Sequence, residues 1–385
     1  MHSQRYGPDD THFNLSVSRS ELNKTLMDAA EEAGAKIHFD VDLSDIDLNS
    51  CTFSMHDRVK NEDETVTGEH IFGVDGANSA VRSEIVTLAS NSQNDVIPLG
   101  TSYKELTLGL LEDGSEPLRT DMLHIWPRGS HFMMGLANQD GSMTMTLYLP
   151  DKGEISVEAL SESRSKVRDY FETFYPDVIP MMPNYLDEYQ SNPDGFLGTL
   201  RCKPWHWKGN AVLLGDACHA ITPFFGQGCN CSFEDVASLD EHMERIGGSG
   251  VIPKSEMRDV FEAYDLDRKP NGDAIANLAL DNYEEMSDRT ADPKFLLKKA
   301  IELRLSKTFP SMYVSRYSLV TQTLVPYHLC EEVSVIQDTI LDKLSSGIKS
   351  AEDADLSMAE RLIRESLVPL FEKNGIVDLA SIPRG

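Results

Sequence analysis

The sequence is short of positive charge. Its 385 residues include 35 Lys and Arg against 63 Asp and Glu, which gives a formal net charge of −28. Long-range repulsion opposes the encounter of such a chain with nucleic acid or with an anionic membrane surface, so neither is expected as a partner. Small ligands are the expected partners, and the acidic surface is most simply a source of solubility.

Long apolar runs and paired cysteines are also lacking. No stretch reaches the roughly eighteen apolar residues of a transmembrane segment, and the opening MHSQRYGPDD has no apolar signal core. The cysteines have neither the spacing of a disulfide framework nor the Cys-x-x-Cys pairs of a structural zinc site. They are Cys51, Cys202, Cys218, Cys229, Cys231 and Cys330. We therefore expect a soluble, cytoplasmic chain without a bound metal.

The first part of the chain alternates between helical and extended patterns. A hydrophobic content of 40% in 385 residues is enough for two or three packed layers or domains. Apolar residues at helical spacing predict a helix over 20–34. Alternating stretches at 36–43, 51–56 and 64–76 predict strands, the last entering a glycine turn at Asp75-Gly76.

The middle of the chain has the pattern of an antiparallel sheet. Between about 99 and 200, apolar-rich segments at 123–129, 131–140 and 142–150 are separated by Gly, Asn and Asp turn residues, which predicts neighbouring strands. Residues 157–175 predict a helix that closes this unit. A wholly apolar run at 210–215 is typical of a buried strand that delivers its last residues to a site.

The remainder of the chain is almost entirely helical in pattern. The predicted helical segments are 232–247, 256–269, 273–286, 294–305 and 365–375. The last apolar stripe could dock on a membrane or on the protein itself. Few lysines flank it, so docking on the protein is expected. Its residues are Leu362, Ile363, Leu367 and Leu370.

Residues 215–235 carry the densest chemical signal. The apolar strand ends at Asp216, whose carboxylate can accept hydrogen bonds from sugar-like hydroxyls. Gly226-Gln227-Gly228 open a helix, and the first amides of a helix have no internal partners. Such a helix start is rich in donors and positive in potential, so it can hold an anion or stabilise charge that develops on a ligand.

This segment carries a family resemblance. GDACHAITPFFGQGCN resembles the second FAD motif of the flavin-dependent aromatic hydroxylases and, through PFFGQG, is most similar to the kynurenine 3-monooxygenases within them. NLSVSRSELNKTL resembles the family segment with an FAD-contacting arginine, and GVDGANSAVR its Asp-Gly motif. LHIWPR resembles the substrate-sheet strand, and DNYEEM and SRYSLVT the C-terminal substrate helices.

The resemblance implies the reaction and its cofactors. In the family, NADPH reduces FAD, oxygen adds to the flavin as a 4a-hydroperoxide, and the distal oxygen is delivered to an aromatic ring, so no side-chain nucleophile or metal is needed. The implied reaction converts L-kynurenine to 3-hydroxykynurenine in tryptophan catabolism. The implied partners are a small aromatic amino-acid substrate and molecular oxygen.

The resemblance also implies two sets of site residues. Five would bind substrate: Tyr6, Phe224, Phe225, Asn282 and Tyr317. Glu285 lies beside them and is either close to the substrate or a helix-surface charge. The cofactor would contact Arg19, Leu43, Asp75, Gly76, Arg82, Gly215, Asp216, Pro223, Gly226, Gln227, Gly228, Cys229 and Asn230.

The implied fold is α/β, or α+β overall, with a departure at its beginning. A truncated FAD-binding Rossmann-like domain would comprise 1–98 and 199–270, with an inserted antiparallel substrate-binding domain at 99–198 and a C-terminal helical region at 271–385. The family's opening Gly-x-Gly-x-x-Gly unit does not occur. A sheet without its first strands would expose apolar edges, so we expect an incomplete gene product or start-site error rather than a shortened protein with little FAD affinity.

Two alternatives to this function stay open at this point. The chain could hydroxylate another aromatic acid, such as salicylate. It could also be an inactive remnant that binds a small ligand or a partner protein. Family members are often held to the mitochondrial outer membrane by an apolar C-terminal segment, but GIVDLASIPRG is too short and polar for that role.

Overall fold

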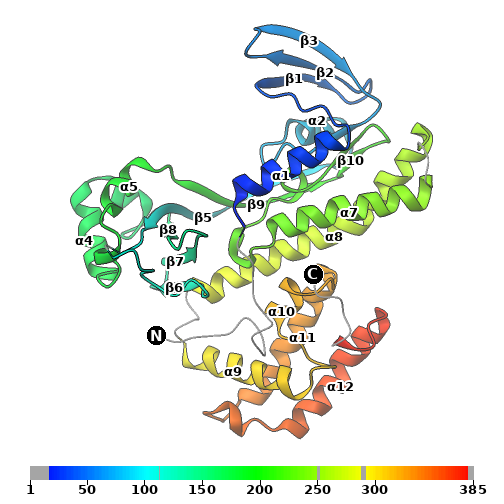
Figure 1. Ribbon diagram of the computed structural model, residues 1–385. Helices are drawn as coiled ribbons and strands as arrows, with labels where there is room; N and C mark the ends of the chain where they lie inside the picture. Colours follow the sequence, from blue (N-terminus) through cyan, green and yellow to red (C-terminus); the bar gives the residue numbers. More distant parts are fainter. Residues whose placement is uncertain (1–16, 112, 249–251, 288–291, 380–385) are drawn as a thin grey trace.

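The computed structural model describes residues 17–111, 113–248, 252–287 and 292–379, and shows a mixed α/β fold (Figure 1). The helices are α1 (Arg19–Glu32), α2 (Ala80–Leu88), α3 (Val157–Ser161), α4 (Arg164–Phe174), α5 (Tyr185–Ser191), α6 (Asp216–His219), α7 (Gly228–Gly247), α8 (Lys254–Ser287), α9 (Pro293–Thr308), α10 (Arg316–Thr321), α11 (Tyr327–Ser345) and α12 (Leu356–Lys373). Short 3-10 turns are η1 (Ile179–Met181), η2 (Pro223–Phe225) and η4 (Ala351–Asp353).

The strands form three separate sheets. They are β1 (Val41–Asp47), β2 (Thr52–Asp57), β3 (Glu62–Thr67), β4 (Ile71–Gly73), β5 (Gln93–Leu108), β6 (His124–Pro127), β7 (Phe132–Ala137), β8 (Met143–Pro150), β9 (Gly195–Lys203), β10 (His206–Trp207) and β11 (Ala211–Leu213). Their orders are β1-β2-β3, β10-β11-β4 and β6-β7-β8-β5-β9.

The β10-β11-β4 sheet positions the turn at Asp75-Gly76, which follows β4, and the turn at Gly215, which follows β11. β11 and β4 are parallel, with Leu213 opposite Gly73, so both strands deliver their following residues to the same edge. A side chain at Gly73 would lie 2.7 Å from Leu213, so glycine is needed for this close approach. β4 is an edge strand, and its Phe72 and the following Val74 are 44% and 69% exposed. An exposed apolar edge is therefore present, as expected.

The five-stranded sheet has its own hydrophobic core. β6, β7 and β8 confirm the three predicted strands, and α4 and α5 cover the sheet with Phe171 and Tyr185. The predicted helix over 157–175 is instead two helices. Ser163 interrupts it, because its side chain caps α4 by accepting a hydrogen bond from the Lys166 amide.

Two further segments differ from the sequence prediction. The stretch 64–76 supplies two strands in two different sheets, because a turn after β3 redirects the chain into β4. The segments 256–269 and 273–286 form one helix, α8, which continues through Pro270. α8 packs along α7 and then reaches the five-stranded sheet at β6 (Figure 1).

Of the C-terminal helices, α11 packs against α8, and α9 and α12 pack against α11. Leu362, Ile363 and Leu367 of α12 are buried in this core, which confirms the prediction that the last apolar stripe docks on the protein. Leu370 packs against the same cluster. Among the helices in the described ranges, none is both long and apolar enough to span a bilayer.

Candidate cofactor and substrate site

The site begins where β11 ends. Gly215 has a φ of 59°, and a side chain there would lie 2.9 Å from the Ser232 hydroxyl, so only glycine makes this turn without strain. The turn leaves Asp216 exposed at the start of α6. Its carboxylate is therefore accessible to a ligand.

The second turn precedes α7. η2 is followed by Gly226, which has a φ of 66° and open space where a side chain would be. α7 then begins at Gly228, and the next two residues, Cys229 and Asn230, are exposed. The first residues of this helix, whose amides have no partner within the helix, thus lie at or near the surface.

The Asp75 turn is tied to the same place by Arg82. The buried Arg82 guanidinium donates to the carbonyl oxygens of Ala77 at 2.6 Å and Ala217 at 2.8 Å, and to Asn94 at 3.0 Å. Asp75 caps α2 by accepting hydrogen bonds from the Ser79 hydroxyl and the Ala80 amide. Arg82 therefore links the Asp75 turn to the segment after Gly215, and the cofactor contacts that the resemblance implies for Asp75 and Arg82 stay predictions.

These residues fit the FAD that the sequence implies. The glycine backbone at Gly226, whose open space would be filled by any side chain, lets a flat ring approach the helix start. The exposed amides of α7 suit negative charge, and the exposed Asp216 suits ribityl hydroxyls. The local shape and the donor set therefore agree with the cofactor.

Four of the five predicted substrate residues come together at η2. The Asn282 side-chain amide donates to the Phe224 carbonyl oxygen at 2.7 Å. The Phe225 and Tyr317 rings are stacked, with centroids 6.1 Å apart and an interplanar angle of 21°. The ends of α8 and α10 are thus fixed against the segment that opens α7. The fifth, Tyr6, lies outside the described residues.

An aromatic wall beside Phe224 was missed from the sequence. The Phe224 ring lies 4.7 Å from Tyr283, 5.4 Å from Tyr148 and 6.1 Å from Phe132, measured between centroids. Tyr283 also shares a hydrogen bond with Thr101 at 2.9 Å. Burial raises the pKa of Tyr148, so its phenol stays neutral. Tyr283 lies within DNYEEM and could have been found from that motif, whereas the two strand residues give no distinctive signal.

Glu285 belongs to a partly buried ionic cluster. Its carboxylate lies 3.3 Å from Arg316 and 3.3 Å from Lys299, and Arg316 also pairs with Asp338 at 2.6 Å. Burial alone would lower the pKa of Lys299, but Glu302 and Glu285 raise it above its usual value. The cluster joins α8, α9, α10 and α11 next to Asn282 and Tyr317. The surface-charge interpretation of Glu285 is therefore wrong.

Two further predicted cofactor residues lie on α1 and β1. Arg19 is the exposed first residue of α1, and Leu43 is 54% exposed on β1, where it pairs with Met55. The β1-β2-β3 sheet that carries Leu43 is separate from the glycine turns (Figure 1). The cofactor contacts that the resemblance implies for Arg19 and Leu43 stay predictions.

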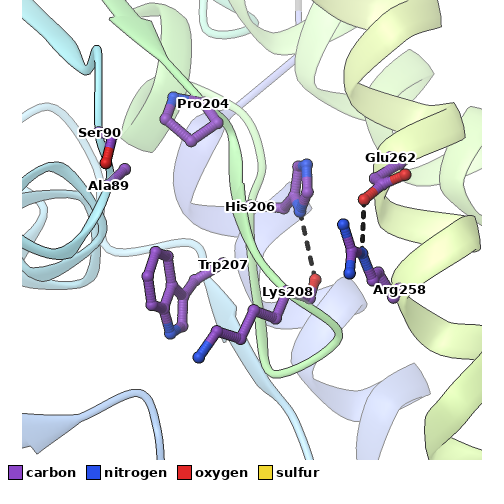
Figure 2. A pocket seen from close by; sticks show the side chains of 8 residues that line it. All are labelled: Ala89, Ser90, Pro204, His206, Trp207, Lys208, Arg258 and Glu262. Carbon is purple, nitrogen blue, oxygen red and sulfur yellow. Dashed lines mark hydrogen bonds and ion pairs between the residues drawn. The ribbon is translucent and has the colours of Figure 1, made fainter.

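A surface pocket of about 340 Å³ lies away from this site. Figure 2 shows that Pro204, Trp207, Lys208 and Arg258 line it, and the Arg258 guanidinium is paired with Glu262 at 2.6 Å. Pro204, Trp207 and Lys208 precede β11, and Arg258 of α8 lies beside Gly209, also before β11. The turns at Gly215 and Gly226 follow the end of β11. The pocket therefore does not face the cofactor turns.

Comparison with known proteins agrees with this geometry. A family model described as a FAD binding domain matches residues 9–156 and 197–275, more than half of the chain. The fold and this match define an FAD-binding protein. Kynurenine 3-monooxygenases of Myxococcus xanthus, Stenotrophomonas maltophilia and Dictyostelium discoideum are 39%, 36% and 37% identical to the chain. The alignments cover 96%, 96% and 94% of this chain and 78%, 79% and 80% of the relatives. The chain belongs to the kynurenine 3-monooxygenase family.

Solved structures show the same fold at low identity. A tetrameric form of 2-methyl-3-hydroxypyridine-5-carboxylic acid oxygenase is 20% identical with a TM-score of 0.53, covering 73% of this chain and 71% of that chain. Klebsiella pneumoniae HpxO, complexed with FAD and uric acid, is 14% identical with a TM-score of 0.53, and the match covers 88% of this chain and 73% of that chain. At these identities the likeness concerns the fold alone.

Proposed function

We propose that this chain is an FAD- and NADPH-dependent monooxygenase that converts L-kynurenine to 3-hydroxykynurenine. One observation carries the proposal. Residues 223–230 present exposed glycine and helix-start amides, while Phe224 in the same segment packs into an aromatic wall and is bonded to Asn282. This short segment can therefore contact the flavin through its backbone and the substrate through Phe224.

The cofactor supplies hydride acceptance from NADPH and activation of oxygen, and the protein supplies its position. We assign Asp216 to the ribityl hydroxyls, and the amides of Gly228, Cys229 and Asn230 to the electron-rich edge of the flavin ring. Gly226 keeps the approach to these amides open. Cofactor binding should therefore depend on Asp216 without any loss of chain stability when it is replaced.

The aromatic wall is proposed to enclose the substrate ring. Phe132, Tyr148 and Phe224 are buried and apolar on their faces, so they exclude water from the reacting atoms. Asn282 and Tyr317, fixed against η2, are assigned to the amino-acid end of the substrate. The polar groups sit at one end of an apolar wall, as an aromatic amino acid requires.

Separate cores support the proposed division of the chain. The core around Trp205 and Tyr264 lies within 1–98 and 199–270, and the core around Phe171 lies within 99–198. A third core, which includes Ile363, lies almost wholly within 271–385. We propose these as the FAD-binding, substrate-sheet and helical units.

The test compares substrates with the purified chain and added FAD. A flavin spectrum, NADPH oxidation stimulated by L-kynurenine, and 3-hydroxykynurenine detected by mass are expected. Stimulation by salicylate alone would show that the substrate assignment is wrong, and absence of flavin binding would favour a non-catalytic ligand-binding chain. Asp216→Ala should weaken FAD binding about tenfold or more while its unfolding free energy stays within about 0.5 kcal/mol of the wild type, because the side chain is exposed.

A further inference from the structure

The carboxylate of Asp235 lies at the centre of a buried ionic network behind the cofactor turns. One oxygen accepts hydrogen bonds from the Gly215 amide at 3.0 Å and from Nε2 of His219 at 2.5 Å. The other accepts from Nε of Arg268 at 2.9 Å. Since an ionised carboxylate only accepts, the hydrogen of His219 is on Nε2. Burial alone would raise the pKa of Asp235, but His219 and Arg268 lower it below its usual value.

None of the three side chains is accessible to a ligand. Asp235 is fully buried, and His219 and Arg268 are 3% and 6% exposed. They therefore act on the cofactor site only through the backbone they hold. α8 approaches this network closely, because a side chain at Gly272 would lie 3.2 Å from Cβ of His219.

The network fixes the relative placement of two helix starts. Asp235 belongs to α7, whereas Gly215 precedes α6 and His219 is its last residue. The carboxylate therefore joins the helix that begins at Gly228 to the turn that carries Asp216. Arg268 of α8 adds a bond to the Cys231 carbonyl oxygen in the first turns of α7 at 3.3 Å. The spacing between the Asp216 carboxylate and the α7 amides is thus set by one buried anion.

A metal ion at this place is a poor alternative. The Cys218, His219 and Asp235 ligand atoms lie within 4.8 Å of one another. A cation bound there would, however, lie beside the Arg268 guanidinium, which already neutralises the same carboxylate. Cys218 also directs its thiol to the Gly215 carbonyl oxygen at 3.2 Å. The geometry favours a hydrogen-bonded ion network.

We propose that Asp235 is a positioning residue for FAD: with Arg268 and His219 it holds the Gly215 turn and the start of α7 at the separation that the cofactor bridges. The proposal rests on the proposed function in its choice of ligand. It requires that the loss of the Asp235 charge disturb FAD affinity and the local order of residues 215–219, beyond any change in overall stability.

The experiment uses the full chain and a matched control. Glu302→Gln removes another buried carboxylate that accepts a backbone amide, Arg316 at 3.1 Å, and pairs with a cation, Lys299 at 3.3 Å. Asp235→Asn is expected to weaken FAD binding about tenfold or more, measured by quenching of flavin fluorescence at a temperature where circular dichroism shows both variants folded. Glu302→Gln should stay within about twofold of the wild type.

Amide hydrogen exchange without cofactor provides a second readout. Asp235→Asn should accelerate exchange in residues 215–219, whereas Glu302→Gln should not. His219→Gln, which keeps a donor near the Nε2 position, should retain tight FAD binding, and His219→Leu should lose it. If Asp235→Asn does not fold, the comparison of His219→Gln with His219→Leu tests the proposal instead.

Two sets of results would overturn the proposal. One is unchanged exchange and FAD affinity in a folded Asp235→Asn chain, and the other is an equal loss in Glu302→Gln. Equimolar zinc in the wild type that disappears in Asp235→Asn would overturn the ion-network assignment as well. If the wild type binds no FAD, the proposed function fails, and the exchange measurement alone still decides whether Asp235 orders the turn.

Discussion

The hydroxyl of Tyr327 donates a hydrogen bond to Oε1 of Gln227 across 3.1 Å, and both side chains are buried. Tyr327 opens α11, whereas Gln227 lies between Gly226 and Gly228, the first residue of α7. Burial raises the pKa of Tyr327, so the hydroxyl remains a protonated donor. The C-terminal helices therefore hold the glycine turn directly.

Tyr327→Phe removes this hydrogen bond without changing the shape of the ring. A neutral hydrogen bond contributes about 1 kcal/mol, so hydroxylation should slow about fivefold if the bond positions the turn in the reacting complex. The measurements are the rate of 3-hydroxykynurenine formation and the amount formed per NADPH oxidised, and both should fall as the turn loosens. Tyr313→Phe is the control, because the Tyr313 hydroxyl is buried and has no hydrogen-bond partner among the described residues. Equal coupling in both variants would contradict a positioning role.

Arg82→Lys tests whether Arg82 contacts cofactor or protein. The planar guanidinium spans two carbonyl oxygens and Asn94, which an ammonium cannot reproduce. The chain without FAD should lose about 2 kcal/mol of unfolding free energy, measured in urea. Arg364→Lys, on the exposed face of α12, should cost less than about 0.5 kcal/mol. Wild-type stability of Arg82→Lys together with weak FAD binding would instead indicate a direct cofactor contact.

His131 makes stability depend on pH. Burial and, to a lesser extent, Arg128 lower its pKa from 6.5 to about 4. The unfolded chain then binds a proton that the folded chain does not, so stability is complete above pH 6.5 and is lost as pH falls toward 4. The titration of His131 should lower the free energy of unfolding by about 2.5 kcal/mol as the pH falls from about 7.5 to about 4.5.

The measurement compares urea unfolding of the wild type with His131→Asn at both pH values. The asparagine can bond to the Tyr170 hydroxyl, which His131 contacts at 2.8 Å, but it does not titrate. Other acidic groups contribute equally to both chains, so the difference between the two pH dependences isolates His131. A parallel fall in both chains would show that His131 does not titrate as described.

Local patterns predicted the glycine turns and most of the helices. The positive φ values of Gly215 and Gly226 follow from residue type and position, and α1, α7 and α12 follow from apolar spacing. β5 could not be found in this way. Its first half contains Pro98 and is exposed on both faces, so its strand conformation depends on pairing with β8 and β9.

Long-range partners account for the rest of what the sequence did not predict. Nothing near Asp235 in the sequence indicates Arg268 or the Gly215 amide, which meet only when α7, α8 and β11 pack together. Phe132 and Tyr148 appear as ordinary strand residues until α8 brings Tyr283 beside them. Asn282, Tyr317 and Arg82 were named from the family resemblance alone, and the cofactor contact that it implies for Arg82 stays a prediction beside the hydrogen bonds that Arg82 makes to Ala77, Ala217 and Asn94.

The continuous course of α8 fixes a distance along the chain. Arg268 and Asn282 lie on the same unbroken helix, so their separation is about 21 Å at about 1.5 Å per residue. Adding or deleting one residue between them would turn the far end by about 100° and carry the Asn282 amide away from Phe224. The length of this stretch therefore sets the distance between the Asp235 network and the aromatic wall beside Phe224.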